Sequence, residues 1–157
     1  MHEDNLAKLR VLLEAYAQRI ATDAPARSAA RGESERRLCG EKLRRLVLPM
    51  LDVVMHELRT AGHEATTRDH TERDNAYPSV ALSFTPKSHL ALASALIFRY
   101  DPRHGVVVQA DVKPAPTART ATAPTGERLG TIGVDALAAE WVETKTLNFI
   151  QAVLKAN

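Results

Sequence analysis

Hydrophobic positions near the N-terminus recur at alternating spacings of three and four residues, which is the period of one face of an α-helix. Five large side chains form this stripe: Leu6, Leu9, Leu13, Tyr16 and Ile20. Val11 and Leu12 broaden it, and Asp4 or Asn5 can cap the first turn. The pattern predicts an amphipathic helix over residues 5–22. Such a helix is marginal in isolation, so we expect its apolar face to pack either on the rest of the chain or on another subunit.

Residues 23–33 contain Pro25 and Gly32 but no large apolar side chain. This composition is typical of a surface linker. We therefore expect a single domain over residues 1–157, in which the N-terminal helix and the linker precede a helix–meander–helix body at residues 34–157.

A second helical stripe follows the predicted linker. Its apolar residues are Leu43, Val47, Met50, Val54 and Leu58. Ser34 is a good N-cap, and Gly62 supplies the left-handed residue that commonly ends a helix, so the helix is expected over residues 34–61. Pro49 lies inside it, lacks an N–H and clashes with the carbonyl of Arg45. The sequence therefore predicts one long bent helix, with two shorter helices as the alternative.

After the second helix the period changes from helical to alternating. Five segments fit β-strands, at residues 63–70, 79–85, 93–100, 106–113 and 128–134. The second segment alternates strictly, with Val80, Leu82 and Phe84 on one side. A loop with Pro102 and Gly105 joins the third and fourth segments as a hairpin. The order of the elements favours a meander.

The pairing within the hairpin follows from the contrast between its two faces. Pairing Tyr100 with Val106 gathers four further residues on the core face, namely Leu96, Phe98, Val108 and Ala110. The other face then carries Ala95, Ile97, Arg99, Val107, Gln109 and Asp111. A slip of one residue would bury polar groups such as Gln109 or Asp111, which is costly. The aromatic residues expected on the buried face, beneath the helices, are Phe84, Phe98 and Tyr100.

A last apolar stripe predicts a C-terminal helix from about residue 137 or 139 to residue 156. Its members are Val142, Leu147, Phe149, Ile150, Val153 and Leu154. We expect Asp135 to cap its start and Trp141 to anchor it against the sheet. Together the elements predict an α+β fold, an antiparallel meander sheet of about five strands with one face covered by the long bent helix and the C-terminal helix. The N-terminal amphipathic helix is added to this body.

Composition limits the class of protein. The chain has 157 residues, 45% hydrophobic and 25% charged, which are values of a globular domain rather than a disordered chain. Its formal net charge of +2 gives no general argument for a nucleic-acid or membrane partner. The sequence has no secretory signal pattern and no run of about 20 apolar residues. Cys39 is the single cysteine and cannot form an internal disulfide, so the expected location is the cytoplasm.

The spacing of the histidines raises the question of a metal site. His56, His63 and His70 recur every seven residues, but the predicted helix ends at Gly62, between the first two. The three therefore share no helix face, and neither a metal site nor a cofactor is expected. No nucleophile and base stand in a recognisable motif, so no catalytic residue is assigned. Cys39 is expected to be a buried thiol.

The strongest charge asymmetry lies between residues 27 and 45. Its basic members are Arg27, Arg31, Arg36, Arg37, Lys42, Arg44 and Arg45, against Glu33, Glu35 and Glu41. Such a patch suits contacts with a phosphate backbone. Single-strand binders also use aromatic side chains for stacking, and the open face of the predicted sheet has none. We therefore rank nucleic-acid binding below a charged, solvated helix face.

These observations favour a non-enzymatic interaction module. We expect it to bind a protein partner or a second copy of itself as a homodimer, because its amphipathic segments exceed what a small sheet needs on one face. The first alternative is a small-ligand-binding or hydrolytic domain with a pocket between sheet and helices, for which the candidate lining residues are Phe98, Tyr100, His104 and Trp141. The second alternative is nucleic-acid binding through the basic segment. No membrane partner is expected.

Overall fold

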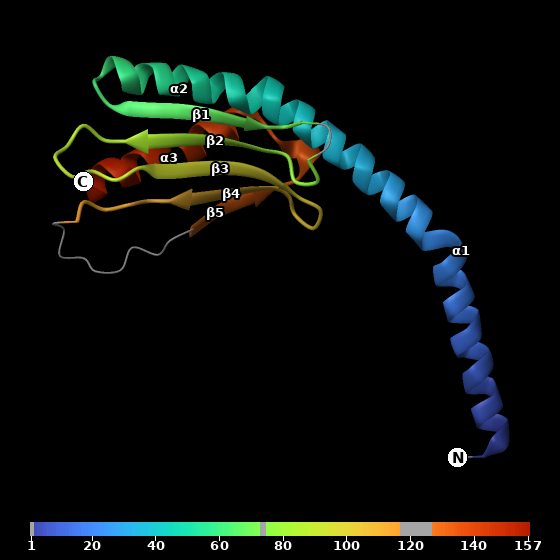
Figure 1. Cartoon of the computed structure of the whole chain (residues 1–157). Coiled ribbons are helices and arrows are strands. Elements are labelled where there is room, and N and C mark those ends of the chain that lie inside the picture. Colours follow the sequence, from blue (N-terminus) through green and yellow to red (C-terminus); the bar gives the residue numbers. More distant parts are fainter. Residues whose placement is uncertain (1, 73–74, 117–126) are drawn as a thin grey trace. The chain divides into compact units, whose positions relative to one another are not determined.

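The computed structural model describes residues 2–72, 75–116 and 127–157, and for residues 19–31 it describes the backbone (Figure 1). The helical elements are α1 (Glu3–Lys42), the π-helical turn η1 (Leu43–Val47), α2 (Leu48–Thr60), the 3-10 turn η2 (Val134–Ala136) and α3 (Ala139–Ala156). The strands are β1 (Glu64–His70), β2 (Ser79–Thr85), β3 (Ser94–Asp101), β4 (Gly105–Asp111) and β5 (Glu127–Ile132). The chain divides into two compact units, residues 1–35 and residues 36–157.

Helix α1 is longer than the sequence predicts. It begins at Glu3 and ends at Lys42, so residues 23–33 are helical where we expect a linker. Four alanines and two arginines stand among these eleven residues, and both types are strong helix formers. This composition supports the helix despite Pro25 and Gly32. The division between the two units falls further along the same helix, after Glu35.

The sequence predicts a bend at Pro49, and the structure has a π-helical turn just before this residue. In η1 the N–H of Leu48 donates to the carbonyl of Leu43, a bond that spans five residues instead of four. Pro49 has no N–H to offer the carbonyl of Arg45, and its ring would crowd that carbonyl in a regular α-helix. A wider turn directly before the proline relieves this conflict without ending the helix.

The π turn also aligns a row of buried side chains. Cys39, Leu43, Val47 and Leu51 are spaced four residues apart, and all four are fully buried. Because an α-helix has 3.6 residues per turn, a row at a spacing of four drifts around the helix axis. A wider turn between Leu43 and Val47 counters this drift. The helix can therefore keep one apolar row on the sheet over its whole contact.

The end of α2 is fixed at Gly62, as predicted. Gly62 has φ of +95°, in the left-handed region that favours glycine. The N–H of His63 donates to the carbonyl of Leu58 at 3.0 Å, and the N–H of Gly62 donates to that of Arg59 at 3.0 Å. These two bonds form a Schellman motif, which turns the chain from the helix into β1.

The five strands form one antiparallel sheet in the order β1-β2-β3-β4-β5, so the α+β meander is confirmed. The predicted hairpin register is also confirmed, since Tyr100 pairs with Val106, Phe98 with Val108, and Leu96 with Ala110. Figure 1 shows the strands side by side, with α2 along β1 and α3 behind the sheet. One irregularity interrupts the pairing of β4 with β5, between Val108 and Gln109.

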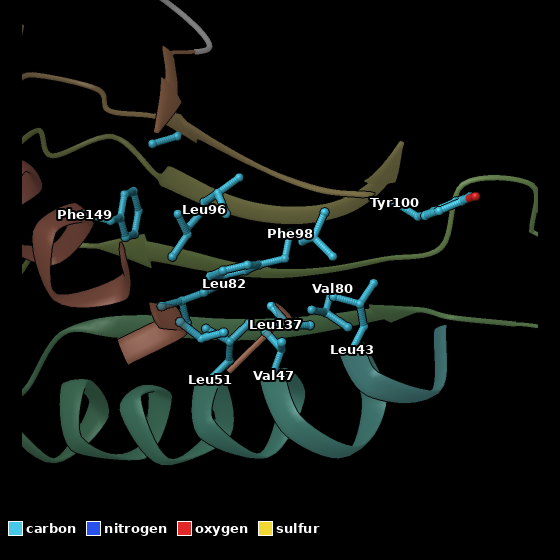
Figure 2. Close-up of a cluster of buried hydrophobic side chains, with 14 of the residues drawn as sticks. Leu43, Val47, Leu51, Val80, Leu82, Leu96, Phe98, Tyr100, Leu137 and Phe149 are labelled. Atoms are coloured by element: carbon cyan, nitrogen blue, oxygen red, sulfur yellow. The ribbon is translucent and has the colours of Figure 1, made fainter. Parts of the chain in front are cut away.

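The core lies between one face of the sheet and the helices η1, α2 and α3 (Figure 2). Its labelled members are Leu43, Val47, Leu51, Val80, Leu82, Leu96, Phe98, Tyr100, Leu137 and Phe149. Phe84, Phe98 and Tyr100 are at most 2% exposed, which confirms that these three rings point inward. The alternate residues of β2, among them Ala81 and Ser83, remain half-buried on the other face.

The start of α3 differs from the prediction that Asp135 caps it. Asp135 lies in η2, and the N-cap residue of α3 is Ala138, which makes no side-chain capping bond. Leu137 and Ala138 have extended backbones, so they separate Asp135 from the first turn of α3. The prediction is therefore wrong, because a short extended segment intervenes between the two elements.

Basic side chains bind backbone carbonyls in the two edge strands of the sheet, β1 and β5. Arg59 of α2 donates through Nε to the carbonyl of Ala65 in β1 at 2.8 Å. Lys145 of α3 donates through Nζ to the carbonyl of Leu129 in β5 at 2.9 Å. In each edge strand, one backbone carbonyl thus accepts a hydrogen bond from a charged side chain of a helix.

Candidate functional site

The described part of α1 between residues 3 and 18 exposes an apolar stripe. The exposed fractions are 38% for Leu6, 42% for Leu9, 58% for Leu13 and 56% for Tyr16. The side chain of Ile20, the fifth predicted member, lies outside the described residues. We call Leu6, Leu9, Leu13 and Tyr16 the N-terminal stripe. Contiguous apolar surface of this kind is typical of a contact with another molecule or segment.

Val11 and Leu12 lie at different positions around the helix relative to the stripe. Val11 is two residues from both Leu9 and Leu13, and at 3.6 residues per turn it therefore lies on the opposite side of the helix. Leu12 lies beside the stripe and is 67% exposed. Leu12 thus broadens the stripe as expected, and Val11 does not.

A basic groove lies where the C-terminal part of α1 meets the loop between β1 and β2. It encloses about 240 Å³. The helix contributes Arg36, Arg37, Gly40, Glu41 and Arg44, and the strand ends contribute Thr71, Glu72 and Pro78. All these residues belong to the second unit. The spacing of the helical members places them on one face, because residues three and four positions apart are neighbours on a helix.

The groove has a closely packed wall at Gly40. This glycine is buried, and a Cβ placed on it would lie 3.6 Å from Cβ of Pro78 and 3.9 Å from the carbonyl oxygen of Thr71. Arg36 also holds the loop, because its Nη1 donates to the carbonyl of Asn75 at 2.7 Å. The backbone N–H of Thr71 donates to Asp69 Oδ1 at 2.9 Å. The helix is therefore joined to the loop by the hydrogen bond of Arg36 and by the packing of Gly40 against Pro78, and the bond from Thr71 to Asp69 orders the start of the loop.

The predicted basic patch separates into three parts. Arg36, Arg37 and Arg44 line the groove, while Lys42 turns away and donates through Nζ to the carbonyl of Val134 at 2.8 Å. Arg45 is exposed and does not line the groove. The side chains of the two remaining members, Arg27 and Arg31, lie outside the described residues.

None of the hollows described among the placed residues is lined by all four candidate pocket residues. Phe98 is fully buried and makes an edge contact with Trp141, with ring centroids 6.5 Å apart. Tyr100 is buried and also lines an open hollow beside Tyr77 and the hairpin. His104 is exposed in that hairpin. Of the four, Tyr100 alone lines any of the hollows described among the placed residues.

The hairpin between β3 and β4 holds one carboxylate with a shifted pKa. The backbone N–H of Arg103 donates to Asp101 Oδ1 at 2.8 Å, and His104 Nδ1 lies 3.3 Å from Asp101 Oδ2. The hydrogen bond from Arg103 is the main reason why the pKa of Asp101 is lowered from its ordinary value of 3.8. The contact with His104 acts in the same direction. This arrangement orders the turn.

The histidines predicted not to converge lie in different surroundings. His56 is exposed on α2, and His70 ends β1. His63, before β1, accepts a hydrogen bond at Nδ1 from the backbone N–H of Lys87 at 2.8 Å and packs edge-on against Phe84. Among the placed side chains, no group of three or more His, Cys, Asp or Glu residues could hold a metal ion. Cys39 is fully buried in the core.

The loop half of the groove is absent from the sequence prediction. Thr71, Glu72 and Pro78 join the arginines only through tertiary packing, and nothing in their local pattern marks them. Gly40 is the one local signal, since a glycine inside a charged helical stretch commonly reflects a close approach of another backbone.

Comparison with models of protein families, with curated protein sequences and with solved structures gave no match. In the part of the chain that the structure describes, no helix combines the length and the apolar character needed to cross a bilayer.

Proposed function

We propose that the protein is a non-enzymatic interaction module that forms a homodimer through the N-terminal stripe of α1. The observation that carries this proposal is the exposure of Leu6, Leu9, Leu13 and Tyr16 along one face of the helix. Large apolar side chains in water cost roughly 25 cal/mol for each Å² that a partner could cover. A second copy offers the same stripe and so a self-complementary surface.

The spacing of the stripe suits a helix pair. Leu6 and Leu13 are seven residues apart, as are Leu9 and Tyr16, so the four side chains follow a heptad repeat over two periods. Leu12 would flank this seam. A heptad repeat keeps apolar side chains facing the partner helix, which a scattered set would not do.

The size of the stripe sets the expected strength of the dimer. If about half of the ~200 Å² surface of each stripe residue and of Leu12 is covered, these five side chains bury about 500 Å² on each copy. A pair then buries about 1,000 Å², near the lower limit for specific interfaces. We therefore expect a dimer that dissociates on dilution rather than an obligate one.

The experiment compares the mass of the full chain with that of two charge variants over a range of concentrations. The double variant Leu9→Glu with Leu13→Glu places carboxylates in the seam and should be monomeric at every concentration. Val11→Glu introduces the same charge on the opposite side of the helix and should retain the dimer. Sedimentation or light scattering measures the mass, and circular dichroism verifies that each variant keeps its helix.

Two results would contradict the proposal. A full chain that is monomeric up to millimolar concentration would show that the stripe does not pair with a second copy. A double variant that keeps the dimer mass would place the interface elsewhere in the chain.

A further inference from the structure

We infer that the basic groove is a binding site for a phosphate dianion, either inorganic phosphate or the phosphate of a small phosphomonoester. The inference is independent of the proposed dimer, because every lining residue lies in residues 36–78 of the second unit. It rests on the hollow between the helix and the loop, on the three guanidinium groups that line it, and on the hydrogen bond by which Arg36 holds the loop.

Arginine is the side chain best suited to this ligand. Its planar guanidinium carries five N–H donors in a fork that matches two phosphate oxygens at once. Arg36 holds the carbonyl of Asn75 through Nη1, and its side chain also lines the groove. Arg44 is exposed and stands two turns further along the same face, so it approaches the ligand from the other end of the groove.

The volume of the groove limits the size of the ligand. Pockets for drug-sized molecules have volumes of roughly 300–1,000 Å³, and this groove holds about 240 Å³. Gly40 creates part of this space, because any longer side chain there would enter the gap between the helix and Pro78. A phosphate group with a small substituent fits such a volume, and no aromatic residue lines it on which a base could stack.

The two carboxylates of the groove define its charge. Among the described lining residues, Glu41 and Glu72 oppose Arg36, Arg37 and Arg44, which gives three positive and two negative charges. A dianion gains from the arginines and is repelled by the glutamates. Glu72 lies on the loop side, and neutralising it leaves the helix face unchanged. The balance therefore predicts that removal of this carboxylate strengthens phosphate binding.

The test measures binding of inorganic phosphate to the full chain by calorimetry and by thermal unfolding, with sodium chloride at equal ionic strength as the reference. The wild type should bind with a saturable isotherm. Arg44→Gln should raise the Kd about tenfold or more, the loss expected for one charge-assisted hydrogen bond. Arg45→Gln is the matched control, because Arg45 is exposed next to Arg44 and does not line the groove. Its Kd should stay within about twofold of wild type.

The variant Glu72→Gln completes the test and should lower the Kd. The inference is overturned if wild type shows no saturable binding, if Arg45→Gln loses as much affinity as Arg44→Gln, or if Glu72→Gln weakens binding. A single-stranded oligonucleotide that binds more tightly than phosphate, and is weakened equally by both arginine variants, would instead assign an extended polyanion surface. Phosphate binding that persists in the double variant Leu9→Glu with Leu13→Glu would support the phosphate site even if the protein proved not to form the proposed dimer.

Discussion

Gly105 lies so close to Ile132 that a Cβ at position 105 would stand 2.6 Å from the carbonyl oxygen of Ile132. Gly105 opens β4 and has φ of +89°, in the left-handed region. The close approach to a backbone atom and the unusual φ both require glycine. The hairpin therefore depends on this residue at the point where β4 begins to pair with β5.

Replacing Gly105 by alanine should lower the free energy of unfolding by about 2–4 kcal/mol, because the variant combines backbone strain with a clash against backbone atoms that cannot move aside. Urea denaturation followed by circular dichroism measures the loss. Gly133→Ala is the control, since a Cβ there has nothing within 4 Å and the φ of −61° suits alanine. That variant should be neutral or slightly more stable. Equal losses in the two variants would contradict the close contact.

The buried row of the long helix should dominate the stability of the second unit. Leu51 is fully buried between α2 and the sheet, whereas Val53, two residues away, is 63% exposed. Leu51→Ala should cost about 2–5 kcal/mol, as expected for a cavity in a packed core. Val53→Ala should change the free energy of unfolding by less than about 0.5 kcal/mol. Chemical denaturation of both variants checks this, and a small loss for Leu51→Ala would show that the helix does not pack as described.

Asp101 should contribute stability that depends on pH. Its pKa in the folded protein is below the ordinary value of 3.8, so folding favours the ionised form. The contribution is therefore present above pH 3.8 and is lost as the pH falls through the folded pKa. Asp101→Asn should have a lower Tm than wild type at pH 7, and the difference should shrink at acid pH as Asp101 becomes protonated. A difference that grows on acidification would have the wrong sign.

The control for this measurement is Asp135→Asn, which removes an exposed carboxylate outside the hairpin. It should show a smaller difference from wild type at neutral pH. Thermal unfolding by calorimetry at neutral and at acid pH gives the comparison.

The sheet was predictable from the sequence because its strands have faces of unequal polarity. Gln109 and Asp111 alternate with Val108 and Ala110, so one register alone keeps polar side chains out of the core. The stop at Gly62 was predictable for a similar local reason, since a glycine commonly ends a helix in the left-handed conformation. At these two places one residue or one short alternation decides the structure, and a local rule is sufficient.

Other features depend on competition between local rules or on distant contacts. Pro49 indicated a disturbance, but the choice between a bend, a break and a π turn depends on how Leu43 and Val47 meet the sheet. In residues 23–33 the alanines and arginines oppose Pro25 and Gly32, and the helix persists. The groove requires the loop after β1 to lie against Gly40, which no periodicity of the chain encodes.

The hydrogen bonds of Arg59 and Lys145 have a consequence for growth of the sheet into larger assemblies. An extended segment from another molecule that paired with Ala65 in β1 or with Leu129 in β5 would compete with a guanidinium or an ammonium group for that backbone oxygen. Strand addition is therefore opposed at these two positions. The most apolar strand of the sheet is β4, which carries Val106, Val107 and Val108. It does not lie at an edge, because β3 and β5 flank it.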